Sequence, residues 1–195
     1  MLDTSTLTDL ALQSYQHYLN VDEALRYQRF VRRERQRQFL AGRVLLRRSL
    51  GQLLKVPHTS LRLIEQRNNA PLLDWPDSPD IGFSLSHSGN WVACAVSATS
   101  RLGLDIELLN PARDFSALAL HVFDAEENAC LNQQDQADRM HDFYRLWTSK
   151  EAHIKLNVPS AQCIQLAHTE LSITLCSARQ LTATPQLLQT SLSVE

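Results

Sequence analysis

The segment from Arg101 to Asn110, RLGLDIELLN, constrains the fold more than any other part of the sequence. Its leucines and isoleucine alternate with Asp105 and Glu107, which is the pattern of a half-buried β-strand, where residues two apart share a face. The two carboxylates are therefore expected on one face, roughly 7 Å apart. Because two buried anions without partners would cost several kcal/mol, we expect a positive charge between them.

The composition predicts an ordinary folded protein. The 195 residues are 44% hydrophobic and 21% charged, enough to bury a core in one large domain or two small lobes. The chain lacks a run of the ~20 apolar residues that a membrane span needs, and the first residues have no basic region ahead of an apolar stretch. We therefore expect a cytoplasmic protein without a membrane partner.

The cysteines favour neither a zinc site nor a disulfide framework. Cys94, Cys130, Cys163 and Cys176 are far apart in the sequence and form no CxxC pair. This usage suits a reducing compartment. We interpret all four as small buried hydrophobic residues.

The charges are distributed unevenly. Residues 26–55 contain ten Arg or Lys and one acid, whereas residues 105–142 contain nine Asp or Glu and two arginines. The basic segment could be a nucleic-acid face, but it lacks interleaved aromatic residues and a helix-turn-helix pattern. We favour a helix whose arginines lie mostly on its outer face, with one or two that contact phosphate. A ligand that carries both phosphates and a metal would suit the two charged segments.

Local patterns predict a mixture of helices and strands. Asn20 and Glu23 form a capping-box pattern before one or two helices that reach about residue 55. Gly89 lies in a turn where a positive φ is expected, and Asp124 is a candidate N-cap. Strands are expected at 60–66, 81–86, 91–97, 101–110 and 169–176, a loop at 67–80, helical structure at 114–156 with a polar connection at 132–138, and a poorly ordered tail.

The clearest helix, at 138–156, carries charged residues on its apolar side. Its apolar stripe runs from Phe143 to Ile154 at helical spacing, with Lys150 inside the stripe and Glu151 and Lys155 on its flank. One interpretation is a solvated Glu–Lys pair worth a few tenths of a kcal/mol. The other is that Glu151 joins Asp105 and Glu107 around a hard cation such as Mg²⁺, while a lysine neutralises phosphate.

His87 lies between Ser86 and Ser88 at the end of a predicted strand. A lone histidine in this position is commonly structural. A hydrolase triad is disfavoured because the sequence has no nucleophile elbow. As a third interpretation, the two hydroxyls, the imidazole and the backbone of Gly89 could donate to the oxygens of a phosphate.

Taken in order, FSLSHSGNWVACAV, GLDIE, FDAEE and WTSKEAHIK resemble the motif series of the Sfp-type 4′-phosphopantetheinyl transferases. With Arg43 in AGRVLLRRSLG, the resemblance extends over residues 43–155. It implies an α+β (α/β) fold, a pseudo-dimer of two similar lobes at residues 1–100 and 101–195. Each lobe would be a small, mostly antiparallel sheet packed with helices, and the active site would lie in the cleft between them.

The resemblance also implies a function. The family transfers the 4′-phosphopantetheine arm of coenzyme A to a serine of an acyl or peptidyl carrier protein, with Mg²⁺, and releases adenosine 3′,5′-bisphosphate. The N-terminal lobe would hold the phosphates and adenine of coenzyme A, and the C-terminal lobe the metal and the catalytic groups. A monomer is expected, because both lobes are in one chain.

Residue roles follow from the resemblance by position. The metal ligands would be Asp105, Glu107 and Glu151. Glu151, or a metal-bound water near it, would be the base for the carrier serine, Lys150 a weaker candidate, and Glu127 a residue of open role that lines the site. Contacts with coenzyme A would come from Arg43, Pro71, Ser86, His87 and Lys155, of which Lys155 would neutralise the phosphate under attack.

The chain departs from the family pattern in three places. Ala70 precedes Pro71 where the family usually has lysine, Ser84 replaces a common asparagine, and the segment LNVPSAQ after Lys155 lacks the usual glycine. The first change removes a phosphate contact, which another arginine could supply. An alternative hypothesis is therefore a non-catalytic homologue that binds coenzyme A or a carrier. Nucleic-acid binding through residues 26–55 is the least favoured hypothesis, and the sequence does not identify the carrier.

Overall fold

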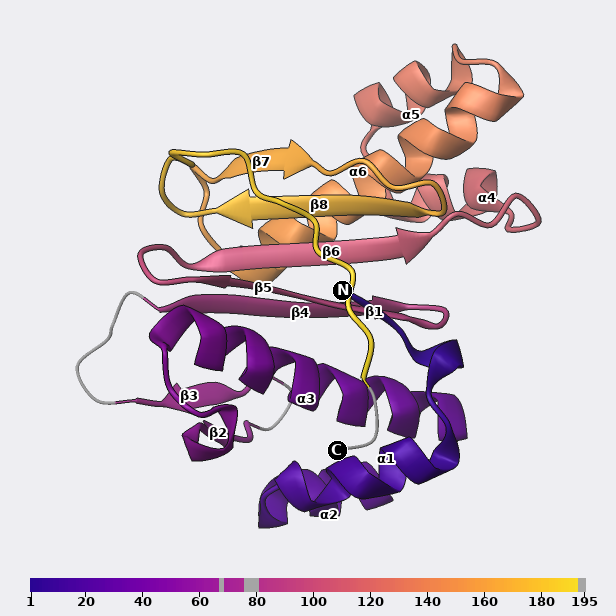
Figure 1. The fold of residues 1–195 in the computed structure, drawn as a ribbon. Helices are drawn as coiled ribbons and strands as arrows, with labels where there is room; N and C mark the ends of the chain where they lie inside the picture. Colours follow the sequence, from indigo (N-terminus) through magenta and orange to yellow (C-terminus); the bar gives the residue numbers. More distant parts are fainter. Residues whose placement is uncertain (67–68, 76–80, 193–195) are drawn as a thin grey trace.

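Two small antiparallel sheets form the centre of the protein (Figure 1). The computed structural model describes residues 1–66, 69–75 and 81–192. The first sheet has the order β1 (Leu2–Asp3), β5 (Trp91–Ser97), β4 (Gly82–Ser88). The second sheet has the order β6 (Leu102–Leu108), β8 (Leu171–Ser177), β7 (Gln162–Gln165). The expectation of a mixed helix and sheet protein with small antiparallel sheets is confirmed.

Helix α3 (Arg33–Leu54) packs on the first sheet. Its apolar residues Leu40, Val44 and Leu45 join Val92 of β5 in a buried core. The remaining elements of this half include the helices α1 (Asp9–Tyr15) and α2 (Val21–Gln28) and the hairpin of β2 (Arg62–Ile64) and β3 (Leu72–Asp74). Three 3₁₀ turns lie at Thr4–Thr6, Gln16–Tyr18 and His58–Ser60. The predicted capping box is present: Asn20 Oδ1 accepts from the Glu23 N–H, and Glu23 Oε2 accepts from the Asn20 N–H.

Helix α6 (Gln136–Leu156) crosses the second sheet, over β6 and β8 (Figure 1). Two shorter helices, α4 (Phe115–Val122) and α5 (Ala125–Asn132), pack near its N-terminal part around Phe123 and Phe143. Asp124 is the N-cap of α5, as predicted. Among the described residues, none of the helices has both the length and the apolar character required to cross a bilayer.

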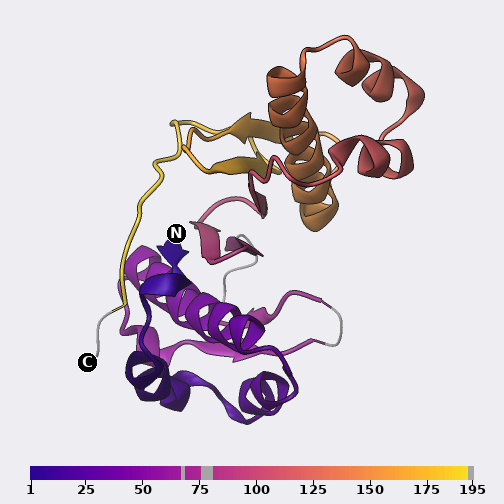
Figure 2. The same cartoon turned by 90° about the vertical axis from the view of Figure 1, so that its right-hand side faces the viewer.

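The chain after β8 forms an extended strap that runs from the second sheet back to the first half of the chain (Figure 2). The Met1 amine donates to the Leu188 carbonyl at 2.7 Å, and the Thr190 N–H donates to the Met1 carbonyl at 2.9 Å. Leu192 is buried in the core beside α3. The expectation of a poorly ordered tail is therefore wrong for residues 178–192, and residues 193–195 lie outside the described residues.

Three strands were not expected from the sequence: the two-residue β1, β3 and β7. The predicted loop at 67–80 contains β3, because Leu73 pairs with Leu63 of β2 and packs in the same apolar cluster. Residues 67–68 and 76–80 of that loop lie outside the described residues. Strand β7 has the sequence QCIQ, which is too short and too polar to give a strand signal.

The interpretation of the cysteines as buried hydrophobic residues needs correction. Cys163 and Cys176 face each other across β7 and β8 and form a disulfide. Cys94 is half-buried, and Cys130 is exposed on α5. The pairing depends on β7, which the sequence did not predict.

Candidate functional site

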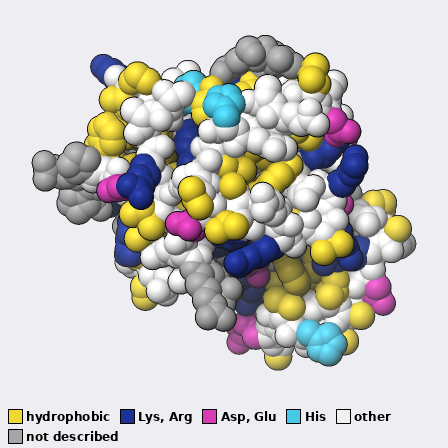
Figure 3. Space-filling model, turned by 90° about the horizontal axis from the view of Figure 1, so that it is seen from below, with side chains coloured by type: hydrophobic (Ala, Val, Ile, Leu, Met, Phe, Trp, Pro, Cys, Tyr) yellow, Lys and Arg dark blue, Asp and Glu magenta, His cyan; other side chains and the backbone are white. Residues whose placement is uncertain are grey.

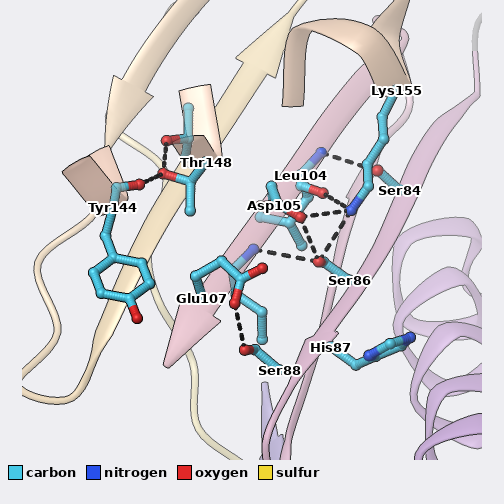
Figure 4. Close-up of polar contacts among 12 residues, drawn as sticks. Ser84, Ser86, His87, Ser88, Leu104, Asp105, Glu107, Tyr144, Thr148 and Lys155 are labelled. Carbon is cyan, nitrogen blue, oxygen red and sulfur yellow. Dashed lines mark hydrogen bonds and ion pairs between the residues drawn. The ribbon is translucent and has the colours of Figure 1, made fainter. Parts of the chain in front are cut away.

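Strand β4 lies next to β6, and three serine side chains join the two strands (Figure 4). The hydroxyls of Ser84, Ser86 and Ser88 accept hydrogen bonds from the N–H groups of Leu104, Ile106 and Leu108, at 2.9, 3.3 and 3.0 Å. The alternation of a strand places all three serines on one face of β4. Hydrogen bonds from the backbone of β6 to serine side chains of β4 thus replace the backbone–backbone hydrogen bonds that join strands within a sheet. They hold the two halves of the chain together at β6.

Asp105 and Glu107 receive hydrogen bonds from the same serines. Ser86 Oγ donates to Asp105 Oδ1 at 2.8 Å, and Ser88 Oγ donates to Glu107 Oε2 at 2.7 Å. The structure therefore places both carboxylates on one face of β6, as the sequence predicts. We call Asp105, Glu107, Lys155, Ser86 and Ser88 the carboxylate site.

Lys155 supplies the positive charge that the paired carboxylates require. Its Nζ donates to Asp105 Oδ1 at 2.7 Å, to Ser86 Oγ at 3.0 Å and to the Leu104 carbonyl at 3.0 Å (Figure 4). Asp105 is 5% exposed, whereas the Lys155 side chain is 32% exposed. The ammonium group thus lies at the boundary between the buried carboxylate and the solvent, where a ligand phosphate can reach it.

Helix α6 reaches the carboxylate site because β6 contains a glycine. A Cβ atom on Gly103 would lie 2.0 Å from the Ala152 carbonyl oxygen, so only glycine permits this approach of helix and strand. Thr148 fixes the same helix to β8, with its hydroxyl 2.8 Å from Thr174 Oγ1 and 3.0 Å from Ser172 Oγ. The side of α6 that carries Lys155 is therefore held against the face of the sheet that carries the carboxylates.

The carboxylate site has one cation, Lys155, for two acids, so it has an excess of negative charge. Asp105 Oδ2 is buried without a hydrogen-bond partner among the described residues. Burial raises the pKa of Glu107, and the charge of Asp105 raises it further, against the hydrogen bond from Ser88. A buried oxygen without a partner, next to a second carboxylate, fits a hard divalent cation, which prefers oxygen ligands and often takes one or two carboxylates from the protein.

Glu151 lies one helical turn before Lys155 and therefore on the same side of α6. It is half-buried. Within the described parts of the chain, the ligand oxygens of Asp105, Glu107 and Glu151 do not all lie within 4.8 Å of one another. The structure thus brings Asp105, Glu107 and Lys155 together, and it leaves Glu151 near them on the helix without a shared contact.

Lys150 and Glu127 contact each other. Lys150 Nζ lies 3.0 Å from Glu127 Oε2 and 5.7 Å from the centre of the Phe123 ring. Glu127 also accepts a hydrogen bond from the Asp124 N–H, in the capping box of α5. These contacts attach α5 to α6, and they account for both residues without any contact with the carboxylate site.

His87 points to the opposite side of β4 from Ser86, toward α3 (Figure 4). Arg35 Nη1 lies 2.6 Å from His87 Nε2. Part of the residue is exposed, yet partial burial of the ring, and then the charges of Arg35 and Lys155, lower its pKa to about 4. The imidazole is therefore neutral at pH 7 and can accept a hydrogen bond from Arg35. Ser86 and His87 do not converge on one point.

Arg43 is buried among acidic residues. Its guanidinium forms ion pairs with Glu23 and Glu65 and stacks on Phe39, with 4.7 Å to the ring centre. Arg47 contacts both oxygens of Glu23, at 3.1 and 2.6 Å, and Arg26 contacts Glu65. We call these residues the arginine–glutamate cluster: Glu23, Arg26, Arg43, Arg47 and Glu65. The expectation that the arginines of this segment lie on outer faces is wrong for Arg43 and Arg47.

Comparison with known proteins gives the family. Residues 8–99 match the family model described as 4′-phosphopantetheinyl transferase, N-terminal, and residues 101–194 match that of the 4′-phosphopantetheinyl transferase superfamily. The 4′-phosphopantetheinyl transferase AcpT of Salmonella typhimurium is 31% identical over 172 residues, 81% of this chain and 85% of the relative. The chain belongs to the 4′-phosphopantetheinyl transferase superfamily.

Two longer relatives also match this chain. The 4′-phosphopantetheinyl transferase HetI of a Nostoc species is 36% identical over 77% of this chain, and Sfp of Bacillus subtilis is 29% identical over 73% of it. The chain spans 62% of the length of each of these two transferases. The two family models meet between residues 99 and 101, at the turn that joins β5 to β6.

The structure adds residues that the family resemblance did not suggest. Arg35 pairs with His87, Gly103 admits α6, and Ser88 orients Glu107. The serine pattern was visible, because Ser84, Ser86 and Ser88 alternate with apolar or aromatic residues along β4. Pro71 is buried at the start of β3, and none of its described contacts links it to the carboxylate site.

Proposed function

We propose that this protein transfers the 4′-phosphopantetheine arm of coenzyme A to a serine of an acyl or peptidyl carrier protein, in a Mg²⁺-dependent reaction that releases adenosine 3′,5′-bisphosphate. The observation that carries the proposal is the carboxylate site: two acids on one strand, one lysine from α6, and a buried carboxylate oxygen without a partner. Membership of the transferase superfamily supports the same activity.

In this proposal Asp105 and Glu107 hold Mg²⁺, with Glu151 as a third ligand. When bound, the ion would neutralise the pyrophosphate of coenzyme A and the charge that develops during phosphoryl transfer. Ser86 and Ser88 keep the two carboxylates oriented. Lys155 is the residue of this chain that neutralises the phosphate under attack, because its ammonium group is already partly exposed beside Asp105.

The proton of the carrier serine goes to Glu151 in this scheme. Glu151 is half-buried and lies on the same side of α6 as Lys155, and its side chain makes no hydrogen bond or ion pair in the described part of the chain. The base would therefore be this carboxylate itself or, where the carboxylate serves as a metal ligand, a water held near it. Lys150 remains a weaker candidate, because its charge is engaged by Glu127. Glu127 would act indirectly, by fixing α5 against α6.

Coenzyme A would bind along β4, on the side of the first half of the chain. The pair of Arg35 and His87, on the other side of β4 from Ser86, offers a cation and a neutral imidazole, and it can supply the phosphate contact that Ala70 does not. Ser86 would contact the phosphates and Pro71 the adenine. Arg43 would need to exchange one of its glutamate partners to reach a phosphate.

We also propose that the two halves of the chain, 1–100 and 101–195, are the two lobes of a pseudo-dimer with the site between them. Each half supplies a three-stranded sheet and one long helix, α3 or α6. A single chain then carries a complete site, and the protein would act as a cytoplasmic monomer. The basic side chains of the first half are interrupted by uncharged and apolar ones on the face seen in Figure 3, which does not favour a nucleic-acid surface.

A carrier panel tests the proposal. The purified protein is incubated with coenzyme A, Mg²⁺ and several apo-carriers, and each carrier is weighed by mass spectrometry. We expect at least one carrier to gain the mass of one phosphopantetheine arm, and EDTA to prevent the gain. If calorimetry shows coenzyme A binding while no carrier gains mass, the protein is a non-catalytic binding homologue.

The variant Asp105→Ala separates catalysis from folding. It removes a proposed metal ligand together with one of two repelling charges, so we expect transfer to fall at least about 1,000-fold while the melting temperature stays within about 3 °C. The half-buried Asp142→Ala, farther along α6, is the matched control and should retain transfer. Full activity of Asp105→Ala would reject the metal assignment.

A further inference from the structure

A second group of reactive side chains lies on the other side of α6 from the carboxylate site. His153, Cys163 and Cys176 place their ligand atoms within 4.8 Å of one another. The two cysteines form a disulfide, and His153 Nδ1 lies 3.4 Å from Cys163 Sγ and 3.7 Å from Cys176 Sγ. Transfer of phosphopantetheine makes no use of this group.

The disulfide joins two strands at directly opposite positions. Cys163 of β7 and Cys176 of β8 are register partners, with Cα atoms 4.0 Å apart, so their side chains leave the sheet on the same face. That face is covered by α6, which presents His153. The ring of His153 is oriented by the Ser149 carbonyl, 3.2 Å from its Nδ1. The strands and the helix thus preform the contact of imidazole and sulfur.

The two sulfurs differ in access. Cys163 is half-buried on β7, the edge strand of its sheet, whereas Cys176 is fully buried beside Ala152 and Leu156 of α6. Cys163 is therefore the less buried of the two cysteines and the first that a small oxidant or a thiol would meet, whereas Cys176 reacts from inside. A disulfide with one sulfur near the surface can form and be reduced without unfolding of the protein.

The other two cysteines lack these features. Cys130 is exposed on α5, and no second cysteine is its partner. Burial raises the pKa of the Cys94 thiol, which donates a hydrogen bond to Ser49 at 3.2 Å. A higher thiol pKa means less thiolate at pH 7 and slower oxidation. These two cysteines serve as internal controls.

We propose that Cys163, Cys176 and His153 form a reversible redox site, a dithiol that a peroxide oxidises to the disulfide and that a dithiol reductant restores. His153 contacts Cys163 Sγ, and the Cys163 thiol gives up its proton to water. The thiolate attacks one peroxide oxygen, the O–O bond breaks, and the hydroxide that leaves takes up a proton to become water. Cys176 then attacks the sulfur of the sulfenic acid; the S–O bond breaks, and the released hydroxide takes the proton of Cys176. Two thiols and hydrogen peroxide give one disulfide and two waters.

The redox state of Cys163 and Cys176 should change the local stability of α6. His153 lies two residues from Glu151 and two from Lys155, and Cys176 packs on Ala152 and Leu156 of the same helix. Reduction releases the link between β7 and β8 under this turn of α6. The consequence is local and can be measured without any assay of transfer, so that this proposal and the proposed function can fail independently.

Thiol counting with peptide mapping tests the redox site. The purified protein is fully reduced, freed of reductant, treated with hydrogen peroxide at pH 7, quenched by alkylation and digested. We expect a Cys163–Cys176 linked peptide and two alkylated cysteines, Cys94 and Cys130, and a return to four alkylated cysteines after dithiothreitol. Oxidation at Cys130 that is as fast as at Cys163, or no linked peptide, would overturn the proposal.

Variants separate the role of each side chain. His153→Gln removes the imidazole that contacts both sulfurs and should slow formation of the disulfide about tenfold at pH 7. The exposed His121→Gln on α4 is the control and should leave the rate unchanged. Hydrogen exchange in residues 149–156 should be faster in the reduced protein, and Cys163→Ser and Cys163→Ala should show no change on addition of peroxide.

A metal site would give a different result. The reduced protein is titrated with Zn²⁺ and analysed by native mass spectrometry. Stoichiometric Zn²⁺ that protects Cys163 from peroxide, and that is lost in His153→Gln, would identify the group as a thiolate metal site and overturn the redox proposal. We expect no stoichiometric binding, because the described residues supply only three protein ligands and Cys176 is fully buried.

Discussion

The arginine–glutamate cluster and the carboxylate site are both groups of buried charges, but they are balanced differently. In the cluster each glutamate contacts two arginines, Glu23 with Arg43 and Arg47, and Glu65 with Arg26 and Arg43. In the carboxylate site, one lysine faces two acids, and Asp105 Oδ2 has no hydrogen-bond partner within the described residues. The cluster thus has an excess of positive charge, and the carboxylate site an excess of negative charge.

The cluster, with three arginines for two glutamates, has a structural consequence. It ties α2 to α3 and to the residue that follows β2, and each of its two glutamates is paired with two arginines. The carboxylate site keeps an excess of negative charge at the junction of the two halves, where burial, and then the charge of Asp105, raises the pKa of Glu107. An excess of negative charge attracts a cation but lowers the stability of the folded protein. Removal of a carboxylate charge should therefore destabilise the cluster and stabilise the carboxylate site.

The largest effect on stability should come from Glu23→Ala. The variant leaves Arg43 and Arg47 buried without their shared partner, which should lower the free energy of unfolding by about 3–5 kcal/mol. Urea unfolding followed by circular dichroism measures the change. The control is Asp9→Ala, which removes exposed ion pairs with Arg33 and Arg37 and should cost less than about 1 kcal/mol. Equal losses in the two variants would contradict a structural role for the cluster.

Gly103→Ala should affect both stability and transfer. The added Cβ would meet the Ala152 carbonyl, so α6 must move away from β6, at a cost of about 2–3 kcal/mol, and Lys155 moves with it. The matched control is Gly42→Ala in α3, where the Cβ would be 3.4 Å from Val92 Cγ1, close to an ordinary contact. The control should be neutral or slightly stabilising, because alanine favours a helix. A Gly103→Ala variant as stable as the wild type would show that the approach of α6 is not tight.

Glu107→Gln should stabilise the protein, in contrast to Glu23→Ala. A raised pKa means that the folded state prefers the protonated form, so the ionised side chain lowers stability at neutral pH. The neutral variant keeps an acceptor for Ser88 and should raise the melting temperature by about 2 °C at pH 7, a gain that shrinks as acid protonates Glu107 in the wild type. Transfer and Mg²⁺ dependence should weaken. The exposed Glu170→Gln is the control, and a loss of stability in Glu107→Gln would contradict the excess of negative charge.

His87→Gln should give the smallest effect, and a pH-dependent one. Because the pKa of His87 falls to about 4 in the folded protein, its contribution to stability is complete above about pH 6.5, the ordinary value, and is lost as the pH falls toward 4. The variant should therefore lose less stability than the wild type between pH 6.5 and 4. Melting curves across this range measure the difference. Parallel curves would show that Arg35 does not hold His87 in the neutral form.

The sequence predicted the features that depend on residues close together in the chain. The shared face of Asp105 and Glu107 follows from strand geometry, and the capping box at Asn20 from helix-start chemistry. The positive φ of Gly89 follows from its turn. Family resemblance added Lys155, whose contact with Asp105 joins residues 50 positions apart.

Features that depend on distant partners could not be predicted. Arg47 looked like a surface residue, since its partner Glu23 is 24 positions away on another helix. The disulfide needed the register of β7 and β8, and β7 has almost no strand signal. The contacts of the serines with β6 needed the packing of the two halves, which no local pattern contains. In each case the residue type was visible and its partner was not.

The hydroxyl of Ser86 has one proton and two lone pairs, and the structure uses all of them. It donates to Asp105 and accepts from the Ile106 N–H and from Lys155. A phosphate that takes a hydrogen bond from Ser86 must therefore displace Asp105 from it. Ligand recognition, carboxylate orientation and the connection of β4 to β6 share a single hydroxyl, so binding at this residue is thermodynamically linked to the relative position of the two sheets.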